Sequence, residues 1–534
     1  MALSVACQPT KSKILDEIIP APQKIEVRKG SLKLNGMAVK CDPAVGEDAF
    51  KAISNFADKV NATGGKLGSV SYSEGDTSNG IVFLKDENLP AENYTIEISK
   101  KTALVKASDF NGFFYSLQTM LQMLPPAVYG NVSMPGEDWS LPCCLIEDGP
   151  RFGYRGMHLD CSRHFWSVEE VKKYLDVMAY FKLNRFHWHL TDDQGWRIEI
   201  LKYPLLTKVA AFREGTQIGY DKSSSDHIPH GGFYSQEEVK DIIAYAAERG
   251  ITIIPEIDLP GHMLGALSAY PWLGCTGGPY TIWTHWGISS EVLCAGKESS
   301  FKFLEDVLGE IADLFPGEYI HIGGDECPKS EWEKCPDCQA LIKKLGFKDQ
   351  GRFSAEQFLQ NYVTKRVQDY LATKGKKIIG WDEILEGELA PGATVMSWRG
   401  AQGGQQAAAK GFDAIMTPNT HFYFDYRQEE DPPYLSAKKL LPISTVYSFD
   451  PYKGIEPENY KHILGIQANL WVEYVAENEH LEYMLLPRML ALCECQWCPQ
   501  EQKDYQRFKA AVVNHEFKVF DAAGYSYAKL IAEE

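Results

Sequence analysis

Two adjacent carboxylates, Asp325 and Glu326, follow a glycine pair in the segment His321-Ile322-Gly323-Gly324-Asp325-Glu326. Because glycine has no Cβ, the pair would let the backbone lie close beneath a ligand, with both acids at a pocket floor. An ionised Asp325 would raise the pKa of Glu326 by like-charge repulsion and keep it protonated. Asp-Glu pairs are also common on protein surfaces, so this interpretation requires the pair to follow a buried strand. The segment then predicts a general acid beside an ionised carboxylate.

Polar and tryptophan side chains also follow the other predicted strands. Apolar sugar faces stack on indole rings, and sugar hydroxyls need charged hydrogen-bond partners, so this combination favours a carbohydrate ligand. The residues concerned are Asp160, Ser162, Arg163, Asp192, Asp193, Glu256, Asp258, His262, Trp381, Asp382, Glu383, Trp398, Arg399, Trp471 and Glu473.

Eight short apolar runs, separated by helical patterns, must position these side chains. Two of the intervening helices carry a capping-box signature, Ser167 with Glu170 and Ser235 with Glu238. The alternation of strand and helix predicts an α/β fold of the (β/α)8 barrel type, whose active residues lie at the C-terminal ends of the strands. The predicted strands are Met157–Cys161, Arg185–Leu190, Ile251–Ile257, Tyr319–Ile322, Lys377–Trp381, Val395–Trp398, Ala414–Thr417 and Ile463–Leu470.

The chain of 534 residues is too long for one modest core, so more than one domain is expected. We predict an N-terminal tail over residues 1–19, a small α+β supporting domain over 20–145, the barrel over 146–502, and a terminal helix packed on the barrel over 503–534. The supporting domain is predicted from strands at Gly80–Leu84, Tyr94–Ile98 and Ala103–Lys106 and a helix at Asn111–Leu124. The main barrel insertions are expected at Pro260–Gly296 and Asn419–His462, after the third and seventh strands.

The segment around Asp325 and Glu326 resembles the signature of family-20 β-N-acetylhexosaminidases, and the resemblance covers most of the chain. Three further segments look like family motifs at the first, second and third strands: Leu159–His164, His187–Gln194 and Pro255–His262. The resemblance implies an exo-acting, retaining enzyme that releases terminal β-linked GlcNAc or GalNAc. It also implies substrate-assisted catalysis, in which the 2-acetamido oxygen of the substrate attacks the anomeric carbon.

The resemblance further implies a role for each matching residue. Glu326 would protonate the glycosidic oxygen and then act as base on water, while Asp325 would orient the acetamido group and stabilise the oxazolinium. Tyr423 would hydrogen-bond the acetamido oxygen. The other implied roles are sugar binding at O3/O4 by Arg163 and at O4/O6 by Asp425 and Glu473, walls formed by Trp381, Trp398 and Trp471, and support of the two acids by Asp192 and His262.

Other interpretations stay open on the sequence. A lacto-N-biosidase-like enzyme of the same family would need a longer pocket for a disaccharide, and a sugar-binding protein without catalysis would not need a protonated acid. Arg163 could be held in a structural salt bridge, and His262 could be a satisfied core histidine. His187 and His189 face one side of a strand, as metal ligands do in other barrels, but further ligands are not evident.

Thirteen cysteines occur in clusters rather than in a spread disulfide framework. Cys327, Cys335 and Cys338, which include a Cys-Pro-Asp-Cys knuckle, have metal-like spacing and predict a structural zinc site behind Glu326. A disulfide and free thiols are the alternatives, and the fourth ligand has no sequence signature. A second group comprises Cys493, Cys495 and Cys498. No cofactor is expected for catalysis.

The formal net charge of −18 argues against nucleic acid or an anionic membrane as the main partner. No run of apolar residues predicts a membrane span. Ser4-Val5-Ala6-Cys7 loosely resembles a lipoprotein cleavage site, although a basic region and a full apolar stretch are missing. We therefore expect an exported protein with a glycan substrate and, if that resemblance holds, a lipid anchor. The sequence does not specify the oligomeric state.

Overall fold

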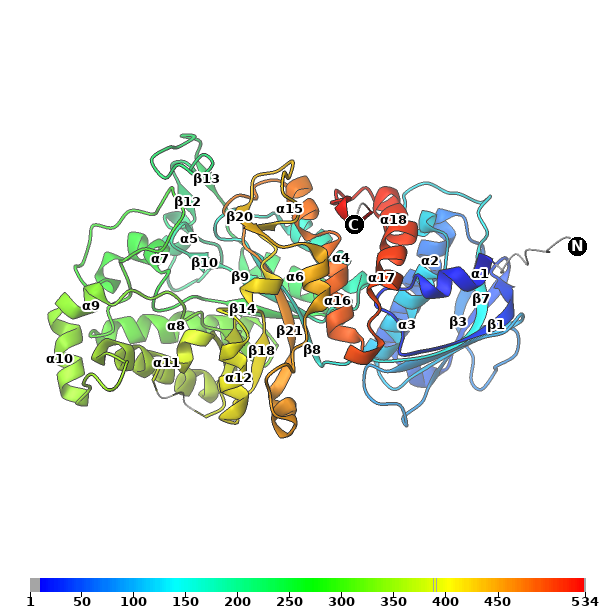
Figure 1. Ribbon diagram of the computed structural model, residues 1–534, viewed down its shortest axis with the longest axis horizontal. Helices are drawn as coiled ribbons and strands as arrows, with labels where there is room; N and C mark the ends of the chain where they lie inside the picture. Colours follow the sequence, from blue (N-terminus) through cyan, green and yellow to red (C-terminus); the bar gives the residue numbers. More distant parts are fainter. Residues whose placement is uncertain (1–9, 388, 390, 533–534) are drawn as a thin grey trace, which may run out of the picture.

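The computed structural model describes residues 10–387, 389 and 391–532. Figure 1 shows a β-sheet domain formed by the first part of the chain, a larger barrel domain beside it, and the C-terminal helices between the two. None of the helices in the described ranges combines the length and apolarity needed to cross a bilayer. The lipoprotein-like stretch Ser4–Cys7 lies outside the described residues.

The first domain is a seven-stranded mixed sheet in the order β1-β7-β5-β6-β4-β2-β3. Helices α2 (Glu47–Thr63) and α3 (Phe110–Gln122) pack on each other and on the sheet. The three predicted strands and the predicted helix are confirmed, and four further strands are present. The strands are β1 (Lys24–Lys33), β2 (Met37–Cys41), β3 (Leu67–Tyr72), β4 (Gly80–Lys85), β5 (Tyr94–Ile98), β6 (Thr102–Ala107) and β7 (Ser140–Asp148).

Both predicted edges of this domain differ from the structure. Strand β7 pairs with β1 and β5 as far as Asp148, so the domain continues past residue 145. The region predicted as a tail contains helix α1 (Thr10–Asp16), which contacts β1 and β7. Ile18 and Ile19 are fully buried, and the Ile19 amide donates to Gln122 Oε1 at 2.8 Å. Residues 10–19 therefore belong to the first domain.

The second domain is a closed parallel barrel in the order β14-β15-β16-β17-β18-β21-β8-β9. All eight predicted strands are confirmed, with ends that differ by at most a few residues. Asp160 and Glu256 end strands paired to β9, at its last residue His189, so polar side chains gather at one end of the barrel. The strands are β8 (Tyr154–Asp160), β9 (Arg185–His189), β14 (Thr252–Glu256), β15 (Tyr319–His321), β16 (Lys377–Trp381), β17 (Thr394–Ser397), β18 (Ala414–Met416) and β21 (Ile463–Leu470).

Two of the helices that follow the strands, those after Ser167 and Ser235, begin where the sequence predicts. Ser167 and Ser235 both form complete capping boxes, with Glu170 and Glu238. The barrel departs from a regular (β/α)8 pattern after β16, where only the 3₁₀ turn η4 (Asp382–Leu385) precedes β17. The main helices are α4 (Val168–Tyr180), α6 (Gln236–Ala247), α8 (Glu298–Leu314), α10 (Pro336–Leu345), α11 (Ala355–Thr373), α12 (Gln402–Ala409) and α16 (Arg488–Trp497).

Three insertions extend the end of the barrel that carries the polar residues. Two follow β14 and β18, as predicted, and include α7 (Leu264–Ala269) and α14 (Ile443–Ser448) respectively. The third follows β9 and was not predicted. It contains two short hairpins, β10 (Thr191–Asp192) with β11 (Gly195–Trp196) and β12 (Phe212–Arg213) with β13 (His230–Gly231).

The C-terminal region forms α17 (Tyr505–Ala511), a five-residue π segment (Val512–Glu516) and α18 (Phe517–Ala523). It packs against the barrel domain, as the Ala528 amide donating to the Leu486 carbonyl oxygen at 3.1 Å illustrates. It also packs against the first domain, because α18 contacts η2 (Pro126–Tyr129). The terminal helix is thus shared by both domains rather than packed on the barrel alone.

A bidentate ion pair between the buried Arg155 and the half-buried Glu92 joins the domains. Arg155 of β8 donates from Nη1 to Glu92 Oε2 at 3.0 Å and from Nη2 to Glu92 Oε1 at 3.1 Å. Because Arg155 is fully buried, Glu92→Gln would leave its charge uncompensated and should lower the free energy of unfolding by about 3 kcal/mol. Urea unfolding measures this loss. The exposed Glu87→Gln is the matched control, and equal stability of both variants would contradict the prediction.

Candidate active site

Asp325 and Glu326 follow β15 in a turn that only glycine permits. Gly323 has φ +64°, and a Cβ there would lie 1.7 Å from Asp258 Oδ1. Gly324 has φ +95°, and its Cβ would meet Ile384 Cγ2 at 3.2 Å. The two glycines therefore make room for side chains of the protein itself, Asp258 and Ile384. The expectation that they let the backbone lie close to a ligand is wrong on the side where their Cβ atoms would lie.

Two residues of this site have a backbone that non-glycine residues rarely adopt. Glu326 has φ +41° and His262 has φ +51°. Such conformations cost about 1–3 kcal/mol each and persist only where surrounding contacts enforce them. The fold therefore loses some stability by holding the side chains of Glu326 and His262 in fixed orientations, as expected of residues with a chemical role.

His262 connects the acid pair to the loop after β9. Its Nδ1 lies 3.1 Å from Asp192 Oδ1 and 3.3 Å from Asp193 Oδ2. Its Nε2 lies 3.8 Å from Asp325 Oδ2 and 3.7 Å from Glu326 Oε2. Although burial alone would lower it, the ion pair with Asp192 raises the pKa of His262 well above its usual value. The site thus holds an imidazolium between two pairs of carboxylates, and His262 is not an isolated core histidine.

Asp325 is half-buried, and its carboxyl group has a raised pKa. Burial raises its pKa to about 6, with further contributions from the nearby Glu256 and Glu326 charges. The carboxyl is therefore still mostly ionised at neutral pH, as predicted. Among the described residues no hydrogen-bond donor reaches its buried Oδ1 atom. An unsatisfied buried carboxylate oxygen points to a ligand that donates a hydrogen bond there.

Glu256, at the end of β14, contacts several histidine and tryptophan side chains inside the barrel. It accepts from Trp381 Nε1 at 2.9 Å and lies 2.9 Å from both His187 Nε2 and His321 Nδ1. His189 Nδ1 lies 2.5 Å from the same carboxylate. Burial opposes ionisation, but these histidines outweigh it and lower the pKa of Glu256 well below its usual value. His187 and His189 therefore belong to this ion-pair network, and each also lies in a group of side chains that could hold a metal ion, His187 with His158 and Glu256 and His189 with Asp192 and Asp258.

The Arg163 guanidinium is surrounded by hydrogen-bond acceptors. It donates from Nε to Gln194 Oε1 at 3.1 Å and from Nη1 to Asp160 Oδ2 at 3.0 Å, and its Nη2 lies 2.9 Å from Asp192 Oδ2. Its guanidinium also lies 5.0 Å from the centre of the Trp471 ring. A guanidinium has five N–H donors, so these contacts leave some of them for a ligand. Both interpretations of Arg163, salt bridge and ligand contact, are compatible.

Aromatic rings form the walls. Trp381 and Trp471 have ring centres 5.9 Å apart, and Tyr423 lies 6.4 Å from Trp471 and 6.1 Å from Trp398. Trp381 is buried, whereas Trp398 and Trp471 are half-buried and present surface. The Tyr423 hydroxyl interacts with Trp471 as a hydrogen-bond partner and is close enough to Asp325 for that charge to raise the pKa of Tyr423 further, beyond the effect of burial.

Asp425 and Glu473 complete the polar side of the site. Burial raises the pKa of both carboxyls, and the charge of Glu473 raises the pKa of Asp425 further. In the described part of the chain, Asp425 Oδ1 is another buried oxygen without a hydrogen-bond partner. The structure thus brings all eleven predicted catalytic and substrate-binding residues to one end of the barrel.

The sequence matches of the two domains identify the family. A profile described as "Glycosyl hydrolase family 20, catalytic domain" matches residues 152–500, and one described as "Glycosyl hydrolase family 20, domain 2" matches residues 16–149. This chain belongs to glycosyl hydrolase family 20. The break between the two family-20 matches agrees with the end of β7 at Asp148.

Relatives in family 20 include a beta-hexosaminidase from Porphyromonas gingivalis, 42% identical over 501 residues, covering 92% of this chain and 62% of that protein. A beta-hexosaminidase from Vibrio furnissii is 38% identical, covering 77% of this chain and 66% of that protein. This chain therefore spans less than two thirds of either relative. Among solved structures, a family-20 exo β-N-acetylglucosaminidase from Vibrio harveyi matches with TM-score 0.83 and 32% identity, covering 96% of this chain and 78% of that one.

Sequence reasoning gave no role to Asp258 and Glu383, although both stood among the residues at strand ends. Burial and the nearby Asp325 charge raise the pKa of Asp258 well above its usual value and that of Glu383 to about 8. The Gly324 amide lies 3.2 Å from Asp258 Oδ1, and Glu383 Oε2 accepts from Trp398 Nε1 at 2.9 Å. Their positions directly after strands β14 and β16 were the sequence feature that could have indicated a role in the site.

The predicted metal ligands are only partly brought together. Cys335 and Cys338 lie beside Cys275 and Cys294, two cysteines of the insertion after β14 that the sequence did not single out. Cys327 is not part of this group, and its Sγ instead faces the Pro328 carbonyl oxygen at 3.8 Å. Assigning Cys327 as a ligand was wrong, because the turn after Glu326 directs its side chain elsewhere. Cys493, Cys495 and Cys498 are buried in and just after α16.

The pKa of Asp325 predicts the acidic limb of the activity profile. If Asp325 acts as a carboxylate, kcat/KM on a neutral glycoside should fall as pH drops below about 6. A raised carboxyl pKa means that the folded chain binds this proton before the unfolded chain does, so acidification here favours folding and the loss is not unfolding at this group. A pH series of kcat/KM with Tm measured alongside tests this. A limb centred near the ordinary aspartate value, about 3.9, would contradict it.

Proposed function

We propose that this family-20 chain is an exo-acting, retaining β-N-acetylhexosaminidase that uses the acetamido group of its substrate as the nucleophile. The observation that carries the proposal is the pairing of Asp325 with Tyr423. Asp325 offers a buried oxygen without a hydrogen-bond partner among the described residues, and Tyr423 has a phenol hydroxyl close enough for the Asp325 charge to raise its pKa. An acetamido group has one N–H donor and one carbonyl acceptor, so it complements this pair.

In the proposed first step, the acetamido carbonyl oxygen attacks C1 of the sugar. The bond from C1 to the glycosidic oxygen breaks, and that oxygen takes the proton of Glu326. The product is an oxazolinium, whose positive charge lies beside the ionised Asp325. Positioning an internal nucleophile in this way replaces a bimolecular encounter and accounts for much of the rate enhancement.

In the second step, water attacks C1 from the face that the leaving group vacated, and Glu326 takes the water proton. The bond from C1 to the acetamido oxygen breaks, so the sugar keeps its β configuration and the acetamido group is restored. His262, held by Asp192, contributes a fixed positive charge near both acids and limits their mutual repulsion.

The remaining site residues suit a single terminal sugar. Trp471 lies under the Arg163 guanidinium, so one indole can serve the ring face while the arginine donors serve the hydroxyl edge. Asp425 and Glu473 provide acceptors for the other edge. The same positions support a non-reducing terminal residue of GlcNAc or GalNAc type, and no observation favours the longer disaccharide pocket of a lacto-N-biosidase.

The test compares p-nitrophenyl β-GlcNAc with p-nitrophenyl β-glucoside and adds a thiazoline analogue of the oxazolinium. We expect cleavage of the acetamido sugar only, with inhibition by the thiazoline. Equal cleavage of the glucoside, or indifference to the thiazoline, would mean that a protein side chain is the nucleophile. Binding of GlcNAc without any turnover would favour the sugar-binding interpretation.

A further inference from the structure

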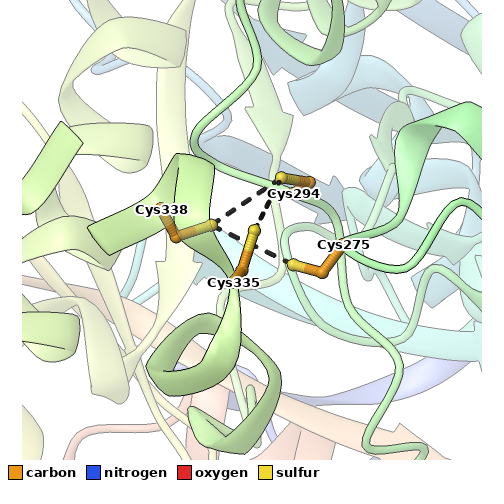
Figure 2. A group of neighbouring side chains, drawn as sticks. All are labelled: Cys275, Cys294, Cys335 and Cys338. Carbon is orange, nitrogen blue, oxygen red and sulfur yellow. Dashed lines mark hydrogen bonds between the residues drawn. The ribbon is translucent and has the colours of Figure 1, made fainter. Parts of the chain in front are cut away.

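Four cysteines from two separate segments of the chain converge on one another, as Figure 2 shows. Cys275 and Cys294 come from the insertion after β14, and Cys335 and Cys338 come from the start of α10. Cys294, Cys335 and Cys338 are buried, and Cys275 is half-buried. No chemistry proposed for the active site uses them.

The distances between the sulfur atoms fit a tetrahedral metal site. Cys294 Sγ lies 3.7 Å from both Cys335 Sγ and Cys338 Sγ, and Cys275 Sγ lies 4.0 Å from Cys338 Sγ. All four ligand atoms lie within 4.8 Å of one another. Four thiolates around zinc at about 2.3 Å would be about 3.8 Å apart in a regular tetrahedron, whereas a disulfide requires about 2.05 Å. The arrangement is therefore the one that a single central ion requires.

We propose that Cys275, Cys294, Cys335 and Cys338 bind one structural zinc ion. Four thiolates in a tetrahedron suit zinc or iron among the common metals, and zinc adds no redox chemistry to a hydrolytic protein. With four protein ligands the ion has no open position for water or substrate, so its role is structural. Binding displaces the four thiol protons to solvent, and the ion with its four thiolates then carries two negative charges.

The surrounding backbone is shaped for this close approach. Cys335 is the N-cap of α10 and Pro336 is its first residue, so the helix start holds both knuckle cysteines on one side. A Cβ on Gly296 would lie 2.2 Å from the Asp337 carbonyl carbon and 2.4 Å from the Cys338 nitrogen. The Gly296 amide also donates to the Cys294 sulfur. Backbone donors of this kind offset thiolate charge around structural metals.

The ion would brace two loops that carry active-site residues. The Leu293 amide donates to the Pro260 carbonyl oxygen at 3.0 Å, two residues before His262, and Trp332 Nε1 donates to the Leu293 carbonyl oxygen at 2.9 Å. The Ser289 amide donates to Asp193 Oδ2 at 3.0 Å, the oxygen that faces His262. The proposed zinc therefore ties the loop after β14 to the loop after Glu326.

The first experiment measures the metal in the full chain purified without chelators or added metal. We expect one zinc per chain by elemental mass spectrometry. After unfolding, replacement by Co²⁺ during refolding should produce the intense absorption bands of tetrahedral cobalt thiolate. Stoichiometric iron, a metal-free chain with four free thiols, or two disulfides in a non-reducing peptide map would each overturn the proposal. None of these readouts depends on the proposed enzymatic activity.

A matched pair of variants tests the ligand assignment. Cys294→Ser removes a ligand and should lose most of the zinc and lower the Tm, whereas Cys327→Ser, in the loop of the acid pair but outside the cluster, should keep one zinc per chain. Equal zinc content in the two variants would overturn the assignment. If Cys294→Ser does not fold, the half-buried Cys275→Ser replaces it, with the same expected loss of zinc.

Discussion

Asp325→Asn is expected to lower kcat/KM by about a thousandfold on both activated and unactivated β-N-acetylglucosaminides, a loss of about 4 kcal/mol of transition-state stabilisation. The reason is that the variant keeps the side chain's size but removes the negative charge beside the developing oxazolinium. Its amide group can also present a donor where the acetamido N–H needs an acceptor. Steady-state kinetics on p-nitrophenyl β-GlcNAc and on a chitobiose substrate measure the loss.

The structure also predicts the stability of this variant. Burial opposes ionisation of Asp325, and although the His262 charge favours it, burial together with the charges of Glu256, Glu326 and Asp192 outweighs that effect and raises the pKa. Removing its charge should therefore leave the Tm unchanged or raise it, so a kinetic loss cannot be attributed to unfolding. Asp369→Asn, the same change on an exposed residue of α11, is the control and should keep full activity. Turnover of Asp325→Asn within a few-fold of wild type would refute the role of the carboxylate.

Glu326→Gln is expected to lower kcat/KM by about a hundred- to ten-thousandfold on a chitobiose substrate, whose leaving group needs a proton. On p-nitrophenyl β-GlcNAc the loss should be much smaller, because the phenolate leaves without protonation. The difference between the two losses isolates general-acid catalysis from substrate binding. Measuring kcat and KM separately for each substrate provides this comparison.

An equal loss on the two substrates would contradict the assignment of Glu326 as the acid. The exposed Glu333→Gln, on the neighbouring helix α9 (Ser330–Lys334), is the matched control and should leave both substrates unaffected. Because Glu326 has a left-handed backbone, Glu326→Gly should relieve strain and stabilise the fold while abolishing acid catalysis. A higher Tm of Glu326→Gly, together with the loss of acid catalysis, would show that the strained backbone at this position is retained for function at a cost in stability.

Much of the barrel could be predicted from local sequence patterns. The barrel strands are short apolar runs because parallel strands are covered on both faces, and this pattern needs no knowledge of the partner strand. The capping boxes of Ser167 and Ser235 mark the starts of two helices, because their side-chain hydrogen bonds lie within one helical turn. Most of the site residues followed from these two patterns, since polar residues at the strand ends of a barrel must meet, whereas Tyr423 and Asp425 lie in the insertion after β18 and were predicted from the family resemblance.

The first domain was harder to predict for a physical reason. Strand β1 lies at the edge of its sheet, is largely exposed, and pairs with β7 from more than a hundred residues away. An exposed edge strand has no apolar face to produce a period of two. Strand β7 has neighbours on both sides, but its apolar run lies directly beside the barrel and was divided between the two domains.

The sequence by itself determined the family, the barrel, and the acid pair Asp325 and Glu326 with the side chains that gather around it, because these depend on residue order along short motifs. Only the tertiary structure decided which cysteines meet. Cys275 and Cys294 lie far from Cys335 in the chain, and Cys327, nearer in sequence, is directed away from the group. Side-chain direction at a turn and the docking of one loop on another are set by packing across the whole domain, which sequence spacing does not encode.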